Sequence, residues 1–172
     1  MKQLSIIFTV IFVSFAAYGS SMKTLIETAQ NKEIQHDAAL IAKHTIKITA
    51  PVHVVWKHLS DVQNWPDWNK EISEVKIENS VKPDTTFIWK SGTTIKSTFR
   101  VVDDPNYLIW TGKVLWTKAI HIWELKPLSE DETMVTVRES MDGFLITMLY
   151  SQEKLDSLLN NWLSNLKSVS EK

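Results

Sequence analysis

Apolar and polar residues alternate over residues 44–49, and this period of two predicts a strand. Pro51 follows, and proline suits the first turn of a helix, where its missing N–H would have no partner. The helix behind it buries one face, which is formed by apolar residues at helical spacing: Val52, Val55, Trp56 and Leu59. Polar residues and a proline break the helical pattern within residues 64–68, and Trp65 and Trp68 are left to pack the corner.

Short alternating runs fill the chain from residue 75 to residue 141, and turn residues separate them. We interpret residues 90–92 as a three-residue hairpin loop, residues 103–106 as a turn, and residues 116–117 as part of a tight turn. Folding at these turns and at the loop 127–131 pairs the following residues: Phe87 with Ile95, Ser97 with Gly112, Phe99 with Trp110, Val101 with Leu108, Val114 with Ala119, Gly112 with His121, Trp110 with Trp123, Leu108 with Leu125, Leu125 with Val135, Trp123 with Val137 and His121 with Glu139. Every pair keeps the apolar residues on one face, and a slip of one residue would scatter them. The pattern therefore predicts an antiparallel meander with one concave apolar face.

A long amphipathic helix is predicted over residues 145–169, which contain neither proline nor glycine. Its apolar residues recur at helical spacing: Met148, Leu155, Leu159, Trp162, Leu166 and Val169. Such a helix can cover the apolar face of the sheet. The predicted fold class is α+β: a curved antiparallel sheet of six to seven strands around the C-terminal helix, with two short helices after the first strand.

Residues 1–19 have the features of a secretory signal peptide, with Lys2 ahead of an apolar stretch and small residues before an expected cleavage between Gly19 and Ser20. The apolar stretch is short for a spanning helix, which needs about 20 residues. We therefore expect a periplasmic or secreted protein without stable membrane insertion, and an N-terminal membrane anchor if the segment is uncleaved. Residues 20–40 are expected to form an N-terminal arm, and residues 41–172 the main domain.

The composition narrows the function classes. The chain of 172 residues suits one main domain, and its net charge of −1 without blocks of like charge gives no reason to expect a nucleic-acid partner. The absence of cysteine excludes disulfides, thiolate metal sites and a cysteine nucleophile. The five histidines are scattered without metal-ligand spacing, so we expect neither a metal nor another cofactor.

Several motifs resemble those of a known superfamily. They are A-P-V-H-V-V-W-K-H-L-S-D-V-Q-N-W-P-D-W-N (50–69), F-x-W (87–89), W-T-G (110–112), H-I-W-E-L (121–125), V-R-E-S-M-D-G (137–143) and N-W-L-S-N-L-K (161–167). On these residues the chain resembles the START-like, helix-grip superfamily, in the polyketide cyclase/dehydrase-type branch often called SRPBCC. The resemblance spans roughly residues 46–167 and implies that residues 41–172 form a START-like ligand-binding domain with a helix-grip fold. Relatives bind lipids, polyketides or hormones, catalyse cyclisation, or act as partners of other proteins, so the resemblance leaves the function open.

The concave face supplies the candidate binding site. Small residues at Ser97, Gly112 and Ala119 lie near one another in the predicted register and leave room beside aromatic rings. An apolar pocket with a few polar groups is the usual form of a small-molecule site, although the same residues can also fill a solid core. The candidate ligand-binding residues are Phe87, Trp89, Ser97, Phe99, Trp110, Gly112, His121, Trp123, Glu139, Met141 and Trp162.

His121 and Glu139 are the candidate catalytic residues. A cross-strand pair of ionisable residues on an apolar face is uncommon, because a buried charge without a partner is costly. Together the two side chains can anchor the polar end of a ligand, act as general acid and base, or form a structural hydrogen bond. We weigh structural or anchoring roles above catalysis.

Three functions remain open. The first is an exported, non-catalytic protein that binds an apolar small molecule, such as a lipid, a polyketide or an aromatic compound. The second is a polyketide cyclase or dehydratase-like enzyme that uses His121 and Glu139, and the third is a protein-interaction module with a filled core. Ile109, Ile120 and Ile122 cluster on the outer face and suggest either a dimer or partner patch or ordinary exposed apolar residues, so we expect a monomer or weak dimer.

Overall fold

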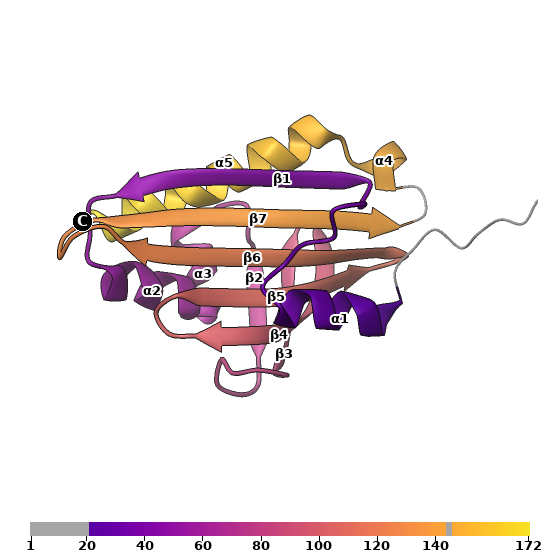
Figure 1. Ribbon diagram of the computed structural model, residues 1–172, viewed down its shortest axis with the longest axis horizontal. Coiled ribbons are helices and arrows are strands. Elements are labelled where there is room, and N and C mark those ends of the chain that lie inside the picture. Colours follow the sequence, from indigo (N-terminus) through magenta and orange to yellow (C-terminus); the bar gives the residue numbers. More distant parts are fainter. Residues whose placement is uncertain (1–20, 144–145) are drawn as a thin grey trace, which may run out of the picture.

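The computed structural model describes residues 21–143 and 146–172 (Figure 1). Within these residues, seven strands form one antiparallel sheet in the order β1-β7-β6-β5-β4-β3-β2. The strands are β1 (Leu40–Ile48), β2 (Glu74–Ile77), β3 (Thr86–Ser91), β4 (Thr93–Asp103), β5 (Tyr107–Val114), β6 (Thr117–Pro127) and β7 (Thr133–Gly143). The only step in this order that joins strands distant in sequence is β1 beside β7, and it places the first strand at one edge of the meander.

Helices lie on both faces of the sheet (Figure 1). The helical elements are α1 (Met22–Gln30), α2 (Val52–Ser60), a 3-10 turn (Val62–Asn64), α3 (Trp65–Trp68), α4 (Ile146–Leu149) and α5 (Gln152–Ser170). The long helix α5 packs with α2 and α3 against the concave face, and α1 packs against the other face. The predicted α+β architecture of a curved sheet around a C-terminal helix is therefore confirmed. Among the described residues, no helix is long and apolar enough to cross a membrane.

The predicted strand registers are confirmed for β6 with β7 and, as far as Phe99, for β4 with β5, whereas the predicted pair of Val101 with Leu108 was wrong. In β6 and β7, His121 lies opposite Glu139 and Trp123 opposite Val137. In β4 and β5, Phe99 lies opposite Trp110. These pairings follow from turn positions that the sequence marks clearly, including the turn in which the Asn106 N–H donates to the Asp103 carbonyl.

The registers of the other two hairpins were wrong by two residues. Phe87 pairs with Ser97 rather than Ile95, because β3 and β4 turn tightly around Gly92, which has a φ of +67°. Trp110 pairs with His121 rather than Trp123, because a two-residue loop joins β5 to β6. A shift of two residues preserves the face on which each side chain lies, so the concave apolar face remains as predicted.

A β-bulge between Phe99 and Val101 changes one predicted inward residue. Val102 pairs with Leu108 and packs against the core of the concave face. Val101 instead pairs with Ile109 and packs on the opposite face. An extra residue in one strand reverses the side-chain alternation beyond it, and regular alternation could not predict this reversal.

The C-terminal helix is interrupted at its start. The chain forms α4 and then α5, and the Ser151 hydroxyl caps α5 by accepting a hydrogen bond from the Lys154 N–H. Met148, predicted on the apolar face, lies on α4 with 77% of its surface exposed, so that assignment was wrong. The remaining helix buries its predicted apolar face through Leu155, Leu159, Trp162 and Leu166.

The outer face of the sheet is covered by α1. Leu25, Ala29 and Ile34 form a buried cluster with the outer isoleucines Ile109, Ile120 and Ile122. The interpretation of these isoleucines as an exposed dimer or partner patch was therefore wrong. The weak apolar pattern of residues 20–40 is sufficient for a short helix because the sheet supplies the other half of this cluster. The predicted signal peptide at residues 1–19 lies outside the described residues.

An aromatic cluster fills the space between the sheet and the helices near α2 and α3. Trp65 is fully buried, and its Nε1 donates a 2.9 Å hydrogen bond to the Leu59 carbonyl oxygen. Its ring meets Trp162 of α5 edge to face at 5.1 Å between centroids, and Phe87 stacks on Phe99 at 4.5 Å. Buried side chains fill this end of the concave face, and a cavity lies toward the first turns of α5.

Candidate functional site

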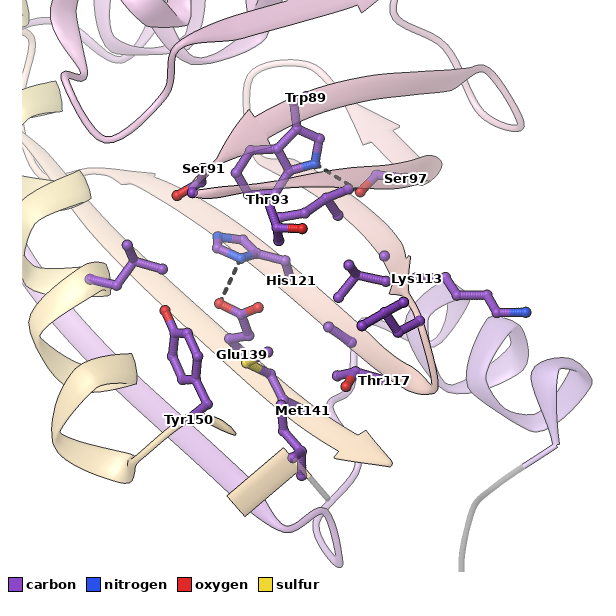
Figure 2. A pocket seen from close by; sticks show the side chains of 18 of the residues that line it. Trp89, Ser91, Thr93, Ser97, Lys113, Thr117, His121, Glu139, Met141 and Tyr150 are labelled. Atoms are coloured by element: carbon purple, nitrogen blue, oxygen red, sulfur yellow. Dashed lines mark hydrogen bonds and ion pairs between the residues drawn. The ribbon is translucent and has the colours of Figure 1, made fainter. Parts of the chain in front are cut away.

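A cavity of about 450 Å³ lies between the concave face of the sheet and the first turns of α5 (Figure 2). The β3–β4 hairpin, the strands β5, β6 and β7, and the helices α4 and α5 form its walls. Protein pockets that enclose small molecules usually measure about 300–1,000 Å³. The space is therefore large enough for a ligand of modest size.

The structure brings eight of the eleven candidate ligand-binding residues to this cavity: Trp89, Ser97, Trp110, Gly112, His121, Glu139, Met141 and Trp162. Phe87, Phe99 and Trp123 do not line it. These three side chains are buried and belong to the aromatic cluster near α2 and α3. They share the concave face with the cavity residues but lie farther along their strands, in the part of the sheet that the helices cover directly.

Small residues create the open space. Gly112 lies directly between Ser97 and Ala119 in adjacent strands, so two short side chains and a glycine without one lie side by side in the sheet. A Cβ atom at Gly112 would lie 3.3 Å from the Ser97 hydroxyl oxygen. That hydroxyl accepts a 3.0 Å hydrogen bond from Trp89 Nε1, which fixes the indole at the cavity wall (Figure 2).

His121 and Glu139 form the polar part of the cavity wall. His121 Nδ1 lies 3.0 Å from Glu139 Oε2 across the β6–β7 ladder (Figure 2). Only 4% of the His121 side chain and 11% of the Glu139 side chain are exposed. Because burial of an unpaired polar group costs free energy, the mutual contact stabilises both side chains in this position.

The imidazole of His121 is held by aromatic rings as well as by Glu139. It stacks on Trp110 with 4.3 Å between ring centroids and an angle of 7° between the planes. The rings of Trp123 and Trp162 also pack against the imidazole, with 5.7 Å and 6.0 Å between the respective ring centroids. The second ring nitrogen, Nε2, is buried without a hydrogen-bond partner. The histidine is thus fixed in orientation, and its second nitrogen is covered by side chains.

Tyr150, between α4 and α5, adds a hydroxyl to the polar wall. Figure 2 shows this hydroxyl pointing into the space beside Glu139 and His121. Burial raises the pKa of Tyr150 to about 12, and the negative charges of Glu139 and Glu71 add to the rise. The phenol is therefore neutral across the physiological range. Lys154 lies over the outer face of the same ring, 4.5 Å from its centroid.

The raised pKa of Tyr150 predicts a loss of stability at alkaline pH. The folded protein keeps the phenol proton up to about pH 12, whereas the unfolded chain releases it near pH 10. The folded state therefore binds more protons between these values, and its free energy of unfolding should fall as the pH rises from about 10 to 12. Urea unfolding at several alkaline pH values should show a flatter decline in Tyr150→Phe. An equally steep decline in Tyr150→Phe would contradict this expectation.

Sequence reasoning missed the residues at the cavity mouth. They come from the β3–β4 hairpin, the β5–β6 hairpin, the helices α4 and α5 and the link between these helices: Ser91, Gly92, Thr93, Lys113, Leu115, Trp116, Thr117, Ile146, Tyr150, Lys154 and Leu158. The amphipathic pattern indicates which face of a strand or helix is apolar. It does not indicate where along that face the sheet and the helix separate and leave a cavity. The one available signal was the pair Leu115-Trp116, two large apolar residues in a predicted turn.

The arrangement can hold an apolar molecule and hydrogen-bond to one polar group on it. Tryptophan rings and aliphatic side chains form most of the walls, and His121, Glu139 and Tyr150 supply converging polar atoms. Among the described residues, no group of three histidine, aspartate or glutamate side chains could hold a metal ion.

Comparisons with known proteins agree with this geometry. The sequence model of a family described as "Polyketide cyclase / dehydrase and lipid transport" matches residues 40–171. A hypothetical protein of Helicobacter pylori has a similar structure, with a TM-score of 0.69, 20% identity, and coverage of 81% of this chain and 93% of that one. A START superfamily protein of Mycobacterium smegmatis has a TM-score of 0.65 and 17% identity over 76% of this chain and 97% of that one.

A further similar structure is the Zhui aromatase/cyclase of Streptomyces sp. R1128, with a TM-score of 0.56 and 17% identity over 75% of this chain and 90% of that chain. At these identities the likeness concerns the fold alone. No curated protein matches the sequence.

Proposed function

This chain belongs to the polyketide cyclase/dehydrase and lipid transport family, and from that premise we propose that it is a binding protein for a small apolar molecule rather than an enzyme. The observation that carries the proposal is the cavity of about 450 Å³, with tryptophan rings in its walls and one polar wall. Burial of apolar ligand surface contributes about 25 cal/mol per Å² removed from water, so such walls can bind without further chemistry.

The polar wall selects the ligand's polar group. The Glu139 carboxylate accepts hydrogen bonds and carries a negative charge, and the neutral Tyr150 hydroxyl beside it can donate or accept. A hydroxyl on the ligand can donate to Glu139, whereas a carboxylate there would meet a like charge. The proposed ligands are therefore neutral apolar molecules with at least one hydroxyl, such as long-chain alcohols or phenols.

The geometry of His121 argues against acid–base catalysis. A general acid or base must come within about 2.6–3.2 Å of the reacting proton or reach it through one water. His121 Nδ1 is taken by Glu139, and Nε2 is buried behind aromatic rings. The histidine therefore acts through Glu139, which it orients toward the cavity.

Matched ligands test this function directly. We expect the protein to bind 1-dodecanol at least about tenfold more tightly than dodecyl methyl ether, which lacks the donor, or dodecanoate, which adds a charge; this is a difference of about 1.4 kcal/mol. Quenching of the fluorescence of Trp89, Trp110 and Trp162 at the cavity wall gives the affinities. In Glu139→Gln, the preference for dodecanol over dodecanoate should disappear, because the amide carries no charge.

Two results would contradict the proposal. One is equal affinity for all three compounds in the natural chain, and the other is an unchanged preference in Glu139→Gln. The control is Glu132→Gln, which removes a charge from an exposed ion pair with Lys47 outside the cavity. It should leave all three affinities unchanged.

The proposal includes export. Its support is the apolar stretch between Lys2 and the small residues at 17–19. Fusion of alkaline phosphatase, which is active only outside the cytoplasm, to the full chain tests the location. The mass of the recovered protein distinguishes cleavage after Gly19 from an uncleaved anchor.

A further inference from the structure

The most exposed large apolar side chains of the described residues gather at one end of the molecule. Met148 is 77% exposed, Leu115 72% and Trp116 71%. Leu115 and Trp116 form the β5–β6 turn at the cavity mouth, and Met148 lies on α4, which contributes Ile146 to the same mouth. The turn and α4 lie at the same end of the sheet in Figure 1. Apolar side chains grouped in this way at an opening usually mark a contact surface.

The turn itself is an unusual place for these residues. Val114 pairs with Thr117, so Leu115 and Trp116 are the whole loop, and Leu115 has a φ of +50°. Two-residue hairpin loops favour glycine, asparagine or aspartate at such positions. A leucine there strains the backbone and leaves its side chain in water, and neither effect stabilises the fold.

The turn is also firmly placed. Thr117 pairs with Gly143 at the end of β7. A Cβ atom at Gly143 would lie 2.3 Å from the Trp116 carbonyl oxygen, so only glycine allows this close approach. The exposed side chains are therefore presented by a packed turn.

The charges at the mouth favour an anionic surface. Lys113 and Lys154 are exposed residues of the cavity lining, and the only acidic residue in the described lining is the buried Glu139. The ammonium end of Lys113 points away from the cavity (Figure 2). Tryptophan with neighbouring lysines is typical of protein segments at the membrane interface, where the ring lies at the headgroups and the ammonium groups meet lipid phosphates. The described chain also begins at this end, at the start of α1 (Figure 1).

We propose that the cavity mouth, with Leu115, Trp116, Lys113 and Lys154 in its lining and Met148 exposed on the neighbouring α4, docks on the surface of an anionic lipid bilayer. In the docked state the three apolar side chains enter the interface and the cavity opens toward the lipid. This inference rests on the proposed binding function and deepens it, since it names the membrane as the place where the ligand is taken up or released.

A site-specific probe tests the docking. The chain has no cysteine, so Leu115→Cys in the full chain can carry one environment-sensitive NBD label. On vesicles of phosphatidylcholine with about one-third phosphatidylglycerol, the label should brighten at least about twofold, and high salt should reduce the effect. The matched control is Leu128→Cys, which is 46% exposed in the loop at the opposite end of the sheet and should not respond.

A second pair of variants separates docking from tethering by the N-terminal segment. With the label at Met148→Cys, the additional changes Leu115→Ser and Trp116→Ser should abolish most of the response. An unchanged response would overturn the proposal, because the N-terminal segment would then hold the protein. Equal brightening at positions 115 and 128, no brightening at either, or brightening without vesicles as protein concentration rises would also overturn it.

The same samples keep the two proposals distinguishable. Dodecanol binding without a vesicle response overturns the docking alone. A vesicle response without dodecanol binding supports the docking surface and overturns the proposed ligand.

Discussion

Replacement of Trp162 by alanine should lower the free energy of unfolding by about 3–5 kcal/mol, the usual range for loss of a large buried aromatic side chain. Trp162 is fully buried, and its ring contacts Trp65, Trp68, Trp89, Trp123 and the imidazole of His121. The side chain therefore joins α5 to the sheet through nearly the whole aromatic cluster. Urea unfolding followed by far-UV circular dichroism measures the loss.

Two variants make this prediction specific. Trp116→Ala removes the same side chain from a position that is 71% exposed, and it should change stability by no more than about 0.5 kcal/mol. Trp162→Phe should cost much less than Trp162→Ala, because the buried Nε1 of Trp162 has no hydrogen-bond partner to lose. Similar losses in Trp162→Ala and Trp116→Ala would show that α5 is not held by this ring.

Gly112→Leu should greatly weaken ligand binding while the protein stays folded. The leucine side chain would project into the cavity next to Ser97 and Ile95, both of which line it. It would therefore occupy the space that a ligand needs. We expect the affinity for 1-dodecanol to fall by roughly 100-fold, which corresponds to about 2.7 kcal/mol. Tryptophan fluorescence titration measures the affinity, and circular dichroism confirms the fold.

Ala119→Leu provides an independent way to fill the same space, because Ala119 lies opposite Gly112 and also lines the cavity. The control is Thr94→Leu, which adds an apolar side chain at an exposed position of β4 that does not line the cavity. It should leave the affinity unchanged. Full dodecanol binding in both folded cavity variants would exclude this cavity as the binding site.

The site could be predicted only in part. His121 and Glu139 were identified as a pair because the β6–β7 register follows from clear turn positions and regular alternation. Phe87, Phe99 and Trp123 carry the same sequence signal as Trp110, yet they belong to the solid aromatic cluster. Alternation marks a face of the sheet, whereas the length of that face that α5, α2 and α3 cover depends on how these helices pack.

The burial of the outer face of the sheet also could not be predicted from local sequence patterns. The alternation of the strands suggested an exposed apolar patch at Ile109, Ile120 and Ile122. The weak apolar pattern of residues 22–30 gave little indication of the helix that covers this patch. Each segment is marginal alone, because a short helix gains most of its stability from the surface against which it packs. The packing of α1 on the outer isoleucines could therefore be recognised only in the tertiary structure.

By itself, the sequence determined the α+β class, the antiparallel meander, the concave apolar face and the opposition of His121 to Glu139. These features depend on local periodicity and on turns, both of which are determined by residues close together in the sequence. Only the tertiary structure decided the bulge at Val101, the break before α5, the burial of the outer isoleucines, and the place where the aromatic core gives way to a cavity. These features depend on contacts between segments far apart in the chain, whose packing no local pattern encodes.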